Sequence, residues 1–332
     1  MSLPTGPELE SLLESEEAAM YEDLFDALPA ALASELGLEA SRVGGALRMT
    51  ARAFDHPMFN RVLAVDRRFP ANLDSDSDHS PGPGRSLSPR DAAELLGNAR
   101  EHYDAAGVRR WMVQILPHME SDALREAAQE WGVVRLRGWV KHLARAEEAG
   151  RAVTSRGSGS SAHLRGRTRS GDTSTPQLHV IRLDAEEAKP VGGLSDLVET
   201  WAHIVVDGFG LPPSFGPWLS ALAGRERWRL YAALHDGKPV ATGALYLPRS
   251  GPGSFGHLNF AATLTEHRRR GAQSAIIARR LEDARGLGAE WIFTETDEAL
   301  PDGPNPSQHN LIRQGLPIVY LRSNWGPPKP EE

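Results

Sequence analysis

The chain has no cysteine, and this absence excludes several kinds of site at once. It cannot carry a disulfide scaffold, a cysteine nucleophile, an acyl-cysteine intermediate or a zinc site with thiolate ligands. No segment approaches the ~20 continuous apolar residues that a membrane helix needs. The first Lys or Arg is Arg42, so the beginning of the chain lacks the basic segment of a signal peptide. We expect an intracellular, cytoplasmic protein without a membrane partner.

Two common phosphate-binding motifs are also missing. The sequence has no Gly-x-x-x-x-Gly-Lys-Ser/Thr loop and no Gly-x-Gly-x-x-Gly turn that opens a Rossmann helix. Their absence disfavours a nucleotide enzyme. The formal net charge is −7, so we expect no nucleic-acid partner either.

The composition is that of a globular protein of about two domains. The 332 residues are 40% hydrophobic and 24% charged, which is close to globular averages. Residues 151–177 hold five arginines among glycines and serines. We interpret them as a flexible, solubilising linker rather than a nucleic-acid tether, because no aromatic residues alternate with the arginines. The predicted division is therefore 1–150, the linker 151–177 and 178–327.

The first part of the chain alternates between helical and strand patterns. Residues 1–41 are acidic and have apolar residues three and four apart, which predicts helices. The elements predicted next are strands at 46–52 and 60–66, a helix at 88–106 capped by Ser88, a strand at 110–116, a helix at 121–131, and one long strand or a strand pair at 133–143. Asp74, Asp76 and Asp78 imitate the start of a calcium loop. However, His79 stands where the turn glycine is needed, so we favour a solvated acidic loop.

The second part follows a similar order. The predicted elements are a strand at 178–183, helices at 194–206 and 218–222, a hairpin of 228–234 and 239–247 around Asp236-Gly237, a strand at 255–263, a helix at 270–287, a strand at 291–296, a helix at 307–314 and a strand at 316–323. The segment Gly107–Trp111 parallels Gly288–Trp291. We interpret this as a degenerate internal duplication.

The strongest local signal is the junction between the strand 255–263 and the helix that follows it. Arg268, Arg269 and Arg270 precede Gly271, where the helix begins. Free N–H groups at a helix N-terminus carry about half a positive charge, and glycine lets an anion approach them closely. A solvated face would not normally gather further cations at that end of a helix. The junction therefore predicts a pyrophosphate site.

The strand, the Arg-x-x-Gly turn and the helix resemble motif A of the GNAT (Gcn5-related) N-acetyltransferase family, which binds acetyl-CoA. The resemblance extends in element order over 178–325, and Asn305-Pro306-Ser307 with Gly315 looks like the family's fourth-helix region. It implies an α/β fold (an α+β mixed sheet flanked by helices) in each of two tandem GNAT-like domains. It also implies an acetyl-CoA-dependent N-acetyltransferase, an acyltransferase of EC 2.3.1 type, with an amine acceptor and no metal.

The residues that the resemblance assigns to acetyl-CoA lie on three segments. They are Ala261, Ala262, Thr263 and Leu264 at the strand end, then Arg268, Arg269, Arg270, Gly271, Ala272, Gln273 and Ser274, and finally Asn305, Ser307 and Asn310. In the family the strand end splays away from its neighbour. Backbone groups near Ala261 and Thr263 then hold the pantetheine and polarise the acetyl carbonyl.

Two positions depart from the family's pattern. Gln273 stands where the family usually has Gly or Ala, and it narrows the space beside the diphosphate. Leu311 stands where many members have a tyrosine that protonates the departing thiolate. Tyr320 or water is the substitute for that acid.

The implied mechanism is direct transfer in a ternary complex, for which the amine must lose a proton. An amine with a pKa of about 10.4 is mostly protonated at neutral pH, so a base or a water chain is required. His257 and Glu295 on neighbouring predicted strands are the candidates. Each has a structural alternative: His257 is then a packed strand histidine, and Glu295 lies at a solvated strand end.

Acceptor binding in the family uses the loop between the first two helices and the last strands. In this chain that implies Asp207, Phe209 and Phe215, with the neighbourhood of Tyr320. The two phenylalanines are alternatively core anchors. The sequence does not name the acceptor, and both a monomer and a homodimer remain open.

The first half offers no comparable cofactor junction. Its segment 85–90 has no glycine, and Pro89 removes one N–H group. We predict that this half binds no CoA and serves as a scaffold, a wall of the acceptor site or a dimer surface. The alternative for the whole protein is a non-catalytic acyl-CoA-binding or regulatory protein that retains the fold.

Overall fold

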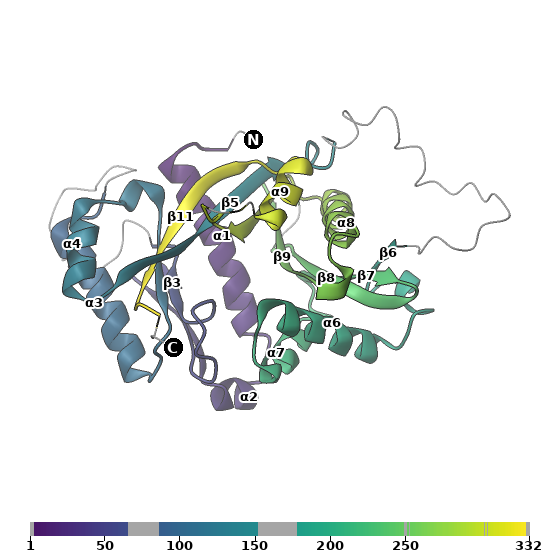
Figure 1. The fold of residues 1–332 in the computed structure, drawn as a ribbon, viewed down its shortest axis with the longest axis horizontal. Helices are drawn as coiled ribbons and strands as arrows, with labels where there is room; N and C mark the ends of the chain where they lie inside the picture. Colours follow the sequence, from purple (N-terminus) through teal and green to yellow (C-terminus); the bar gives the residue numbers. More distant parts are fainter. Residues whose placement is uncertain are drawn as a thin grey trace. The chain divides into compact units, whose positions relative to one another are not determined.

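The computed structural model describes residues 3–65, 86–151, 178–248, 253–301 and 305–329, together with Gly251 and Gly303. The acidic loop around Asp74 and residues 152–177 of the expected linker lie outside these ranges. The chain forms two compact units, each coloured by sequence in Figure 1. Unit 1 comprises Met1–Lys141 and Val319–Glu332, and unit 2 comprises His142–Ile318. The end of the chain thus packs with unit 1.

Unit 1 is a mixed sheet with helices packed on it. Its elements are α1 (Pro7–Phe25), α2 (Ala30–Glu35), β1 (Leu38–Val43), β2 (Ala46–Ala51), β3 (Arg61–Leu63), α3 (Pro89–Ala105), β4 (Met112–Ile115), α4 (Asp122–Glu130), most of β5 (Val134–Arg145) and most of β11 (Ile318–Gly326). The strand order is β1-β2-β3-β4-β11-β5. The β3–β4 pair is parallel, whereas β1–β2, β2–β3 and β4–β11 are antiparallel.

One expectation for this unit was wrong. We expected only helices within 1–41, the last of them ending at Leu36, but Leu38–Val43 is strand β1. Gly44 and Gly45 follow it with φ of 56° and 92°, which is the backbone of a two-residue hairpin turn. The turn folds β1 back onto β2, and the resulting ladder outweighs the helical pattern of the flanking sequence.

A fully buried group of charged side chains lies between α1 and the strands of unit 1. Glu14 and Glu17 on α1 face Arg61, Lys141 and Arg322. Arg322 Nη1 donates to Glu14 at 2.5 Å and to Glu17 at 2.6 Å, and Lys141 Nζ donates to Glu17 at 2.6 Å. Burial alone would raise the pKa of Glu17, but the three cations and the hydrogen bond from Arg322 hold it well below its ordinary value.

Unit 2 is also a mixed sheet, and it contains the predicted cofactor junction. Its elements are β6 (Leu178–Arg182), α6 (Leu194–Phe209), α7 (Gly216–Ser220), β7 (Trp228–His235), β8 (Lys238–Tyr246), β9 (Phe255–Thr263), α8 (Ala272–Gly286), β10 (Trp291–Asp297) and α9 (Pro306–Arg313), with short 3-10 turns at Glu186–Ala188, Pro213–Phe215 and Thr265–His267. The strand order is β10-β9-β8-β7-β6. Strands β6 to β9 form an antiparallel meander, and β9 and β10 are parallel.

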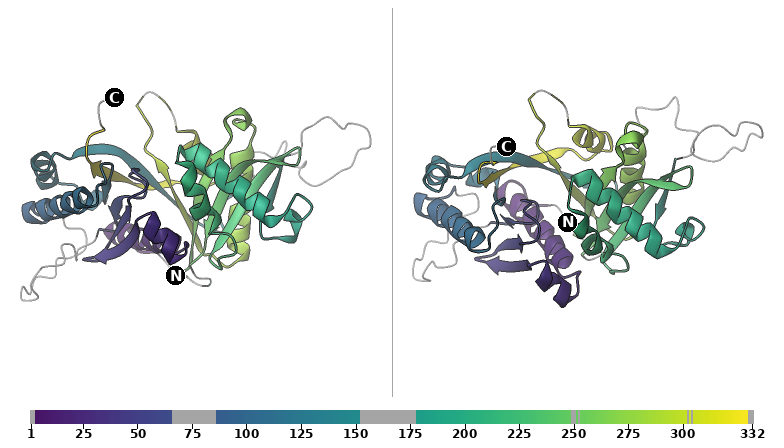
Figure 2. Two further views of the ribbon diagram at one scale, coloured as in Figure 1. Left: turned by 90° about the horizontal axis from the view of Figure 1, so that it is seen from below. Right: turned by 60° about the horizontal axis from the view of Figure 1, so that its bottom comes forward.

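The helices of unit 2 flank its sheet, with α6 and α8 both packed on β8 (Figure 2). This architecture confirms the predicted α/β fold class. The predicted β7–β8 hairpin is confirmed as well, because Asp236 and Gly237 both have positive φ at its turn. The core forms where Ile277 and Leu281 of α8 pack with Leu258 of β9. Burial of this face fixes the start of α8 relative to the end of β9.

Candidate functional site

The N-terminus of α8 is open and unblocked. Gly271 precedes the helix with φ of 86°, and a Cβ atom built there would meet nothing within 4 Å. The N–H groups of Ala272, Gln273 and Ser274 have no hydrogen-bond acceptor within the described part of the chain. Such N–H groups, together with the helix dipole, favour an anion. The geometry therefore suits a phosphate group placed over Gly271.

The three arginines before Gly271 add positive charge that no carboxylate of a described residue pairs with. Arg268, Arg269 and Arg270 are exposed, and none of them forms an ion pair with another described residue. Arg268 Nε donates to the carbonyl oxygen of Thr263 at 3.2 Å, which ties this arginine to the end of β9. Uncompensated cations at a helix N-terminus are unfavourable until an anion binds. The turn is therefore arranged for a ligand of negative charge.

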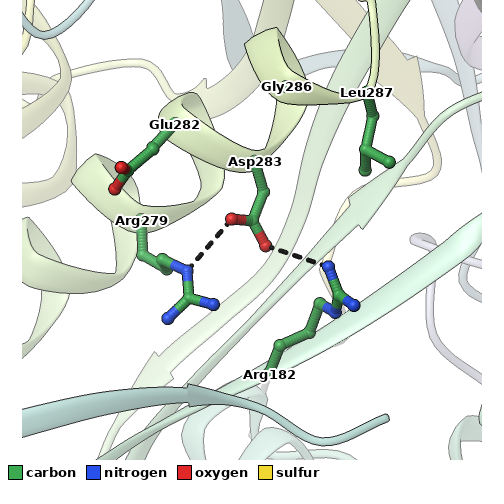
Figure 3. A pocket seen from close by; sticks show the side chains of 6 residues that line it. All are labelled: Arg182, Arg279, Glu282, Asp283, Gly286 and Leu287. Atoms are coloured by element: carbon green, nitrogen blue, oxygen red, sulfur yellow. Dashed lines mark hydrogen bonds and ion pairs between the residues drawn. The ribbon is translucent and has the colours of Figure 1, made fainter. Parts of the chain in front are cut away.

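A surface pocket at the other end of α8 provides a contrast (Figure 3). It has a volume of about 470 Å³, and its lining includes Arg182, Arg279 and Asp283. Here the cations are paired: Arg279 Nε lies 3.0 Å and Arg182 Nη1 3.5 Å from Asp283, as the dashed lines in Figure 3 show. Arg279 also contacts Glu187 at 2.7 Å. This network ties β6 to α8 and leaves little charge for an anion.

Strands β9 and β10 diverge beside the start of α8. Their paired residues end at His257 and Phe293, although β9 continues to Thr263 and β10 to Asp297. Thr294 Oγ1 still donates to the carbonyl oxygen of Leu258 at 2.8 Å. Beyond this contact, no described strand pairs with the β10-facing edge of β9. The expected splay of the strand end, where Ala261, Ala262 and Leu264 were assigned to the cofactor, is thus present.

His257 and Glu295 meet at the point of divergence. His257 Nε2 and Glu295 Oε2 are 2.7 Å apart, and the imidazole stacks on Phe293 with ring centroids 4.1 Å apart. The His257 side chain is 1% exposed and that of Glu295 is 11% exposed. The Nδ1 atom of His257 is buried and has no hydrogen-bond partner among the described residues, which favours the tautomer that carries its proton on Nε2 and donates to Glu295. Glu295 is the member of the pair that solvent reaches.

A second buried histidine, which the sequence did not indicate, lies beside this pair. His142 Nδ1 lies 2.9 Å from the carbonyl oxygen of Leu316 and therefore donates to it. Its Nε2 atom accepts from Thr296 Oγ1 at 3.2 Å. Burial lowers the pKa of His142, although the hydrogen bond to Leu316 and the charge on Glu295 act in the opposite direction. His142 thus anchors the strand end that carries Glu295.

The side chain of Gln273 is turned toward α9. Its Nε2 atom donates to Ser307 Oγ at 2.9 Å, and its Oε1 atom accepts from Asn310 Nδ2 at 2.6 Å. Asn305 caps α9 by accepting from the N–H groups of Ser307 and Gln308. Asn305, Ser307 and Asn310 were assigned to the cofactor. Of these, the structure brings Ser307 and Asn310 into contact with Gln273 at the start of α8.

The position of the family's acid and the candidate substitute Tyr320 have different surroundings. Leu311 is 5% exposed and belongs to the apolar core of unit 2. Tyr320 belongs to unit 1, where its hydroxyl donates to Glu14 at 3.0 Å. Burial and the neighbouring Glu14 raise the pKa of Tyr320 well above its ordinary value, so its hydroxyl holds its proton more tightly.

The three expected acceptor-binding residues differ in exposure. Asp207 is exposed and Phe209 is partly exposed at the end of α6. Phe215 is fully buried and packs edge-on against Trp218, with ring centroids 4.6 Å apart. Phe215 is therefore a core anchor, which was the alternative to an acceptor-binding role, and none of its surface is exposed to a ligand.

The start of α3 in unit 1 lacks the features found at α8. Ser88 caps α3 by accepting from the N–H group of Asp91 at 3.2 Å, as the sequence predicts. Pro89 occupies the first helical position. Arg85 lies outside the described residues. That unit 1 binds no CoA remains a prediction, and this self-capped terminus is consistent with it.

The described residues contain neither a cluster of metal ligands nor a membrane-spanning helix. No three His, Cys, Asp or Glu side chains among these residues gather as a metal site would require. Within the same part of the chain, no helix combines the length and the apolar character needed to cross a bilayer.

Comparison with known proteins gave one family and several similar folds. Residues 199–302 match the model described as "Acetyltransferase (GNAT) family". No curated protein matches the chain. A structure from Kribbella flavida, described as a GCN5-related N-acetyltransferase, is 14% identical with a TM-score of 0.54, and 95% of each chain is covered. A protein from Staphylococcus epidermidis ATCC 12228, described as functionally unknown, is 10% identical with a TM-score of 0.50, and 87% of this chain and 94% of that chain are covered.

These findings bear on different parts of the chain. At such identities the structural likeness concerns the fold, and it extends over nearly the whole chain. The family match is narrower, but it contains β9, the turn at Gly271, α8 and β10. Those elements build most of the candidate site, whereas α9 lies beyond the matched residues. Residues 199–302 therefore form a domain of the GNAT acetyltransferase family.

Proposed function

We propose that the protein is an acetyl-CoA-dependent N-acetyltransferase that transfers the acetyl group directly to an amine in a ternary complex. The observation that carries this proposal is the open N-terminus of α8. There, free N–H groups and three unpaired arginines surround the space over Gly271. A diphosphate matches both the charge and the hydrogen-bonding needs of that turn.

The cofactor residues divide into two groups. The N–H groups that follow Gly271, with Arg268 and Arg270, would hold the diphosphate. The unpaired edge of β9 near Ala261 and Thr263 would hold the pantetheine by backbone hydrogen bonds. The bound acetyl-CoA would supply an electrophilic thioester carbonyl. Gln273, held by Ser307 and Asn310, would keep its amide beside the diphosphate without extending over Gly271.

Glu295 is the proposed general base, and His257 is the residue that positions it. The carboxylate of Glu295 is reached by solvent, whereas His257 is enclosed and donates to it. Glu295 would take a proton from the acceptor ammonium directly or through water, leaving a neutral amine able to attack a carbonyl. The structural alternative for His257, a packed histidine, fits its burial and its stacking on Phe293.

Water is the proposed source of the proton for the departing thiolate. Leu311 has no proton to give, and the Tyr320 hydroxyl is engaged with Glu14 in unit 1. A thiol such as that of CoA has a pKa of about 8.5, so its thiolate leaves readily without a strong acid. Loss of the family tyrosine is therefore compatible with turnover.

The proposal is tested in two steps. Calorimetric titration with acetyl-CoA and with ATP identifies the ligand class, and we expect binding of acetyl-CoA only. Free-thiol release is then measured with a panel of small amines, amino sugars and peptides. Release that depends on one class of amine supports the enzyme. Preference for ATP would refute the proposal.

A second candidate function is a non-catalytic acyl-CoA-binding protein. The buried Leu311 at the usual acid position is the observation that favours it. It predicts tight acetyl-CoA binding and no thiol release with any amine. The same two measurements therefore separate the two candidates.

A further inference from the structure

Arg280 is a buried cation on the inner face of α8. It is 2% exposed and lies one helical turn from Ile276 and from Ala284, both of which are buried. No carboxylate among the described residues lies within ion-pair distance of it. Burial lowers the pKa of Arg280 to about 10, so the guanidinium is still charged at neutral pH. An apolar side chain at this position would avoid the cost of burying a charge.

Within the described part of the chain, the guanidinium is hydrogen bonded only to backbone carbonyl groups. Arg280 Nη1 donates to Ala244 at 3.0 Å and to Asn259 at 3.1 Å, and Nε donates to Ile276 at 3.4 Å. Gly243 makes room for it, since a Cβ atom there would lie 3.0 Å from the guanidinium carbon.

The contact lies at an irregularity between β8 and β9. The register shifts between Thr242 and Ala244, and Phe260 has φ of 49°, which is unusual for a residue with a side chain. Two neutral donors satisfy other carbonyl groups there: Trp201 Nε1 donates to Gly243, and Thr242 Oγ1 donates to Phe260. Neutral side chains thus suffice for such carbonyls, so the charge of Arg280 requires a further reason.

The peptide group between Asn259 and Phe260 connects this cation to the open side of β9. Its C=O lies on the β8 edge, where Asn259 is opposite Ala244. Because a trans peptide has its C=O and N–H on opposite sides, the N–H of Phe260 points to the other edge. That edge faces β10, beyond the last pair of His257 and Phe293.

We propose that Arg280 is a positioning residue that polarises the Asn259–Phe260 peptide, so that the N–H of Phe260 becomes a stronger donor to an oxygen bound between β9 and β10. This inference rests on the proposed function, in which that oxygen belongs to the acyl carbonyl of acetyl-CoA. A cation at the C=O end of a peptide withdraws electron density from its N–H. In a site with little water, this effect grows as negative charge develops on the oxygen.

The test compares Arg280→Gln, which retains hydrogen-bond donors without charge, with Arg280→Lys, which retains the charge. Thermal melting verifies the fold of each variant. The main readout is the vibrational frequency of acetyl-CoA labelled with ¹³C at the carbonyl, which needs no turnover. We expect a downshift on binding to the wild type, most of it retained in Arg280→Lys and most of it lost in Arg280→Gln. The kcat of Arg280→Gln should fall at least tenfold, with the KM for acetyl-CoA changed less than threefold.

The matched control is Arg279→Gln, which removes the neighbouring charge on α8. Arg279 pairs with Asp283 and Glu187 on the side of the helix shown in Figure 3. This variant should melt at a lower temperature but keep the carbonyl shift and the kcat.

Three results would overturn the inference. The first is a wild type that binds acetyl-CoA without a carbonyl downshift. The second is an equal downshift and an equal kcat in Arg280→Gln and Arg280→Lys. The third is an Arg279→Gln control that loses as much of the downshift and of kcat as Arg280→Gln does. In each case acetyl-CoA still binds, and the proposed function stands. A wild type that does not bind acetyl-CoA refutes the proposed function, and the role of Arg280 with it.

Discussion

Substitution of Gly271 by alanine separates the conformational role of this glycine from its role toward a ligand. The φ of 86° lies in the left-handed region, where a residue with a Cβ atom costs roughly 1–2 kcal/mol. No neighbour lies within 4 Å of the new methyl group, so no further cost from clashes is expected. The free energy of unfolding should therefore fall by about 1–2 kcal/mol.

The effect on binding should be larger than the effect on stability. The methyl group would occupy the space through which an anion reaches the N–H groups of α8. Hydrogen bonds to a charged group contribute about 1.5–3 kcal/mol each, so loss of one weakens acetyl-CoA binding by about 10- to 150-fold. Calorimetric titration measures the affinity, and chemical denaturation measures the stability.

Gly224→Ala is the matched control for this substitution. Gly224 also lies in unit 2, has φ of 79° and has nothing within 4 Å of its virtual Cβ atom. It should lose a similar amount of stability and bind acetyl-CoA as the wild type does. If Gly271→Ala retains wild-type affinity while losing the same stability as Gly224→Ala, the start of α8 is not the ligand site.

Four further predictions follow from the geometry. Removal of both Arg268 and Arg270 by alanine should weaken acetyl-CoA binding by roughly 1–3 kcal/mol and reduce its salt dependence in calorimetry, and an unchanged affinity would place both outside the site. Glu295→Gln should lower kcat by about 100- to 10,000-fold with little change in acetyl-CoA affinity, and a variant that keeps the kcat and the pH–rate profile of the wild type would contradict a base. The pKa of Glu17 is lower in the folded protein than its unfolded value near 4.5, so the ionised carboxylate stabilises the fold above that value and the stabilisation is lost as the pH falls through the folded pKa. Glu17→Gln should flatten this acid dependence in denaturation curves and lower the free energy of unfolding by about 3–5 kcal/mol at neutral pH. A CoA analogue should protect the start of α8 from hydrogen exchange but not residues 85–105, and protection of that range would refute the prediction for unit 1.

The junction at α8 could be predicted from the sequence because its causes are local. The run Arg268-Arg269-Arg270-Gly271 lies within a few residues of the N–H groups that it surrounds. The same holds for the Asp236-Gly237 turn, where two adjacent residues decide the hairpin. Strand β1 was missed because its partner strand, and not its own pattern, stabilises it.

Arg280 could have been noticed from the sequence, but its meaning could not. It follows Ile276 by one helical turn and precedes Ala284 by another, so the helical period places a charge on the buried face of α8. That a backbone irregularity of β8 and β9 lies against this position is visible only in the folded sheet.

The sequence by itself determined most elements of each unit, strand β1 excepted, together with the glycine-led start of α8 and the charge gathered there, because such features depend on neighbours a few residues apart. Only the tertiary structure decided which side chains meet. His257 and Glu295 are 38 residues apart in the chain, and Tyr320 and Glu14 are 306 apart. Pairs of this kind depend on strand register and on which unit a strand joins, and both are set by the burial of whole faces rather than by local sequence.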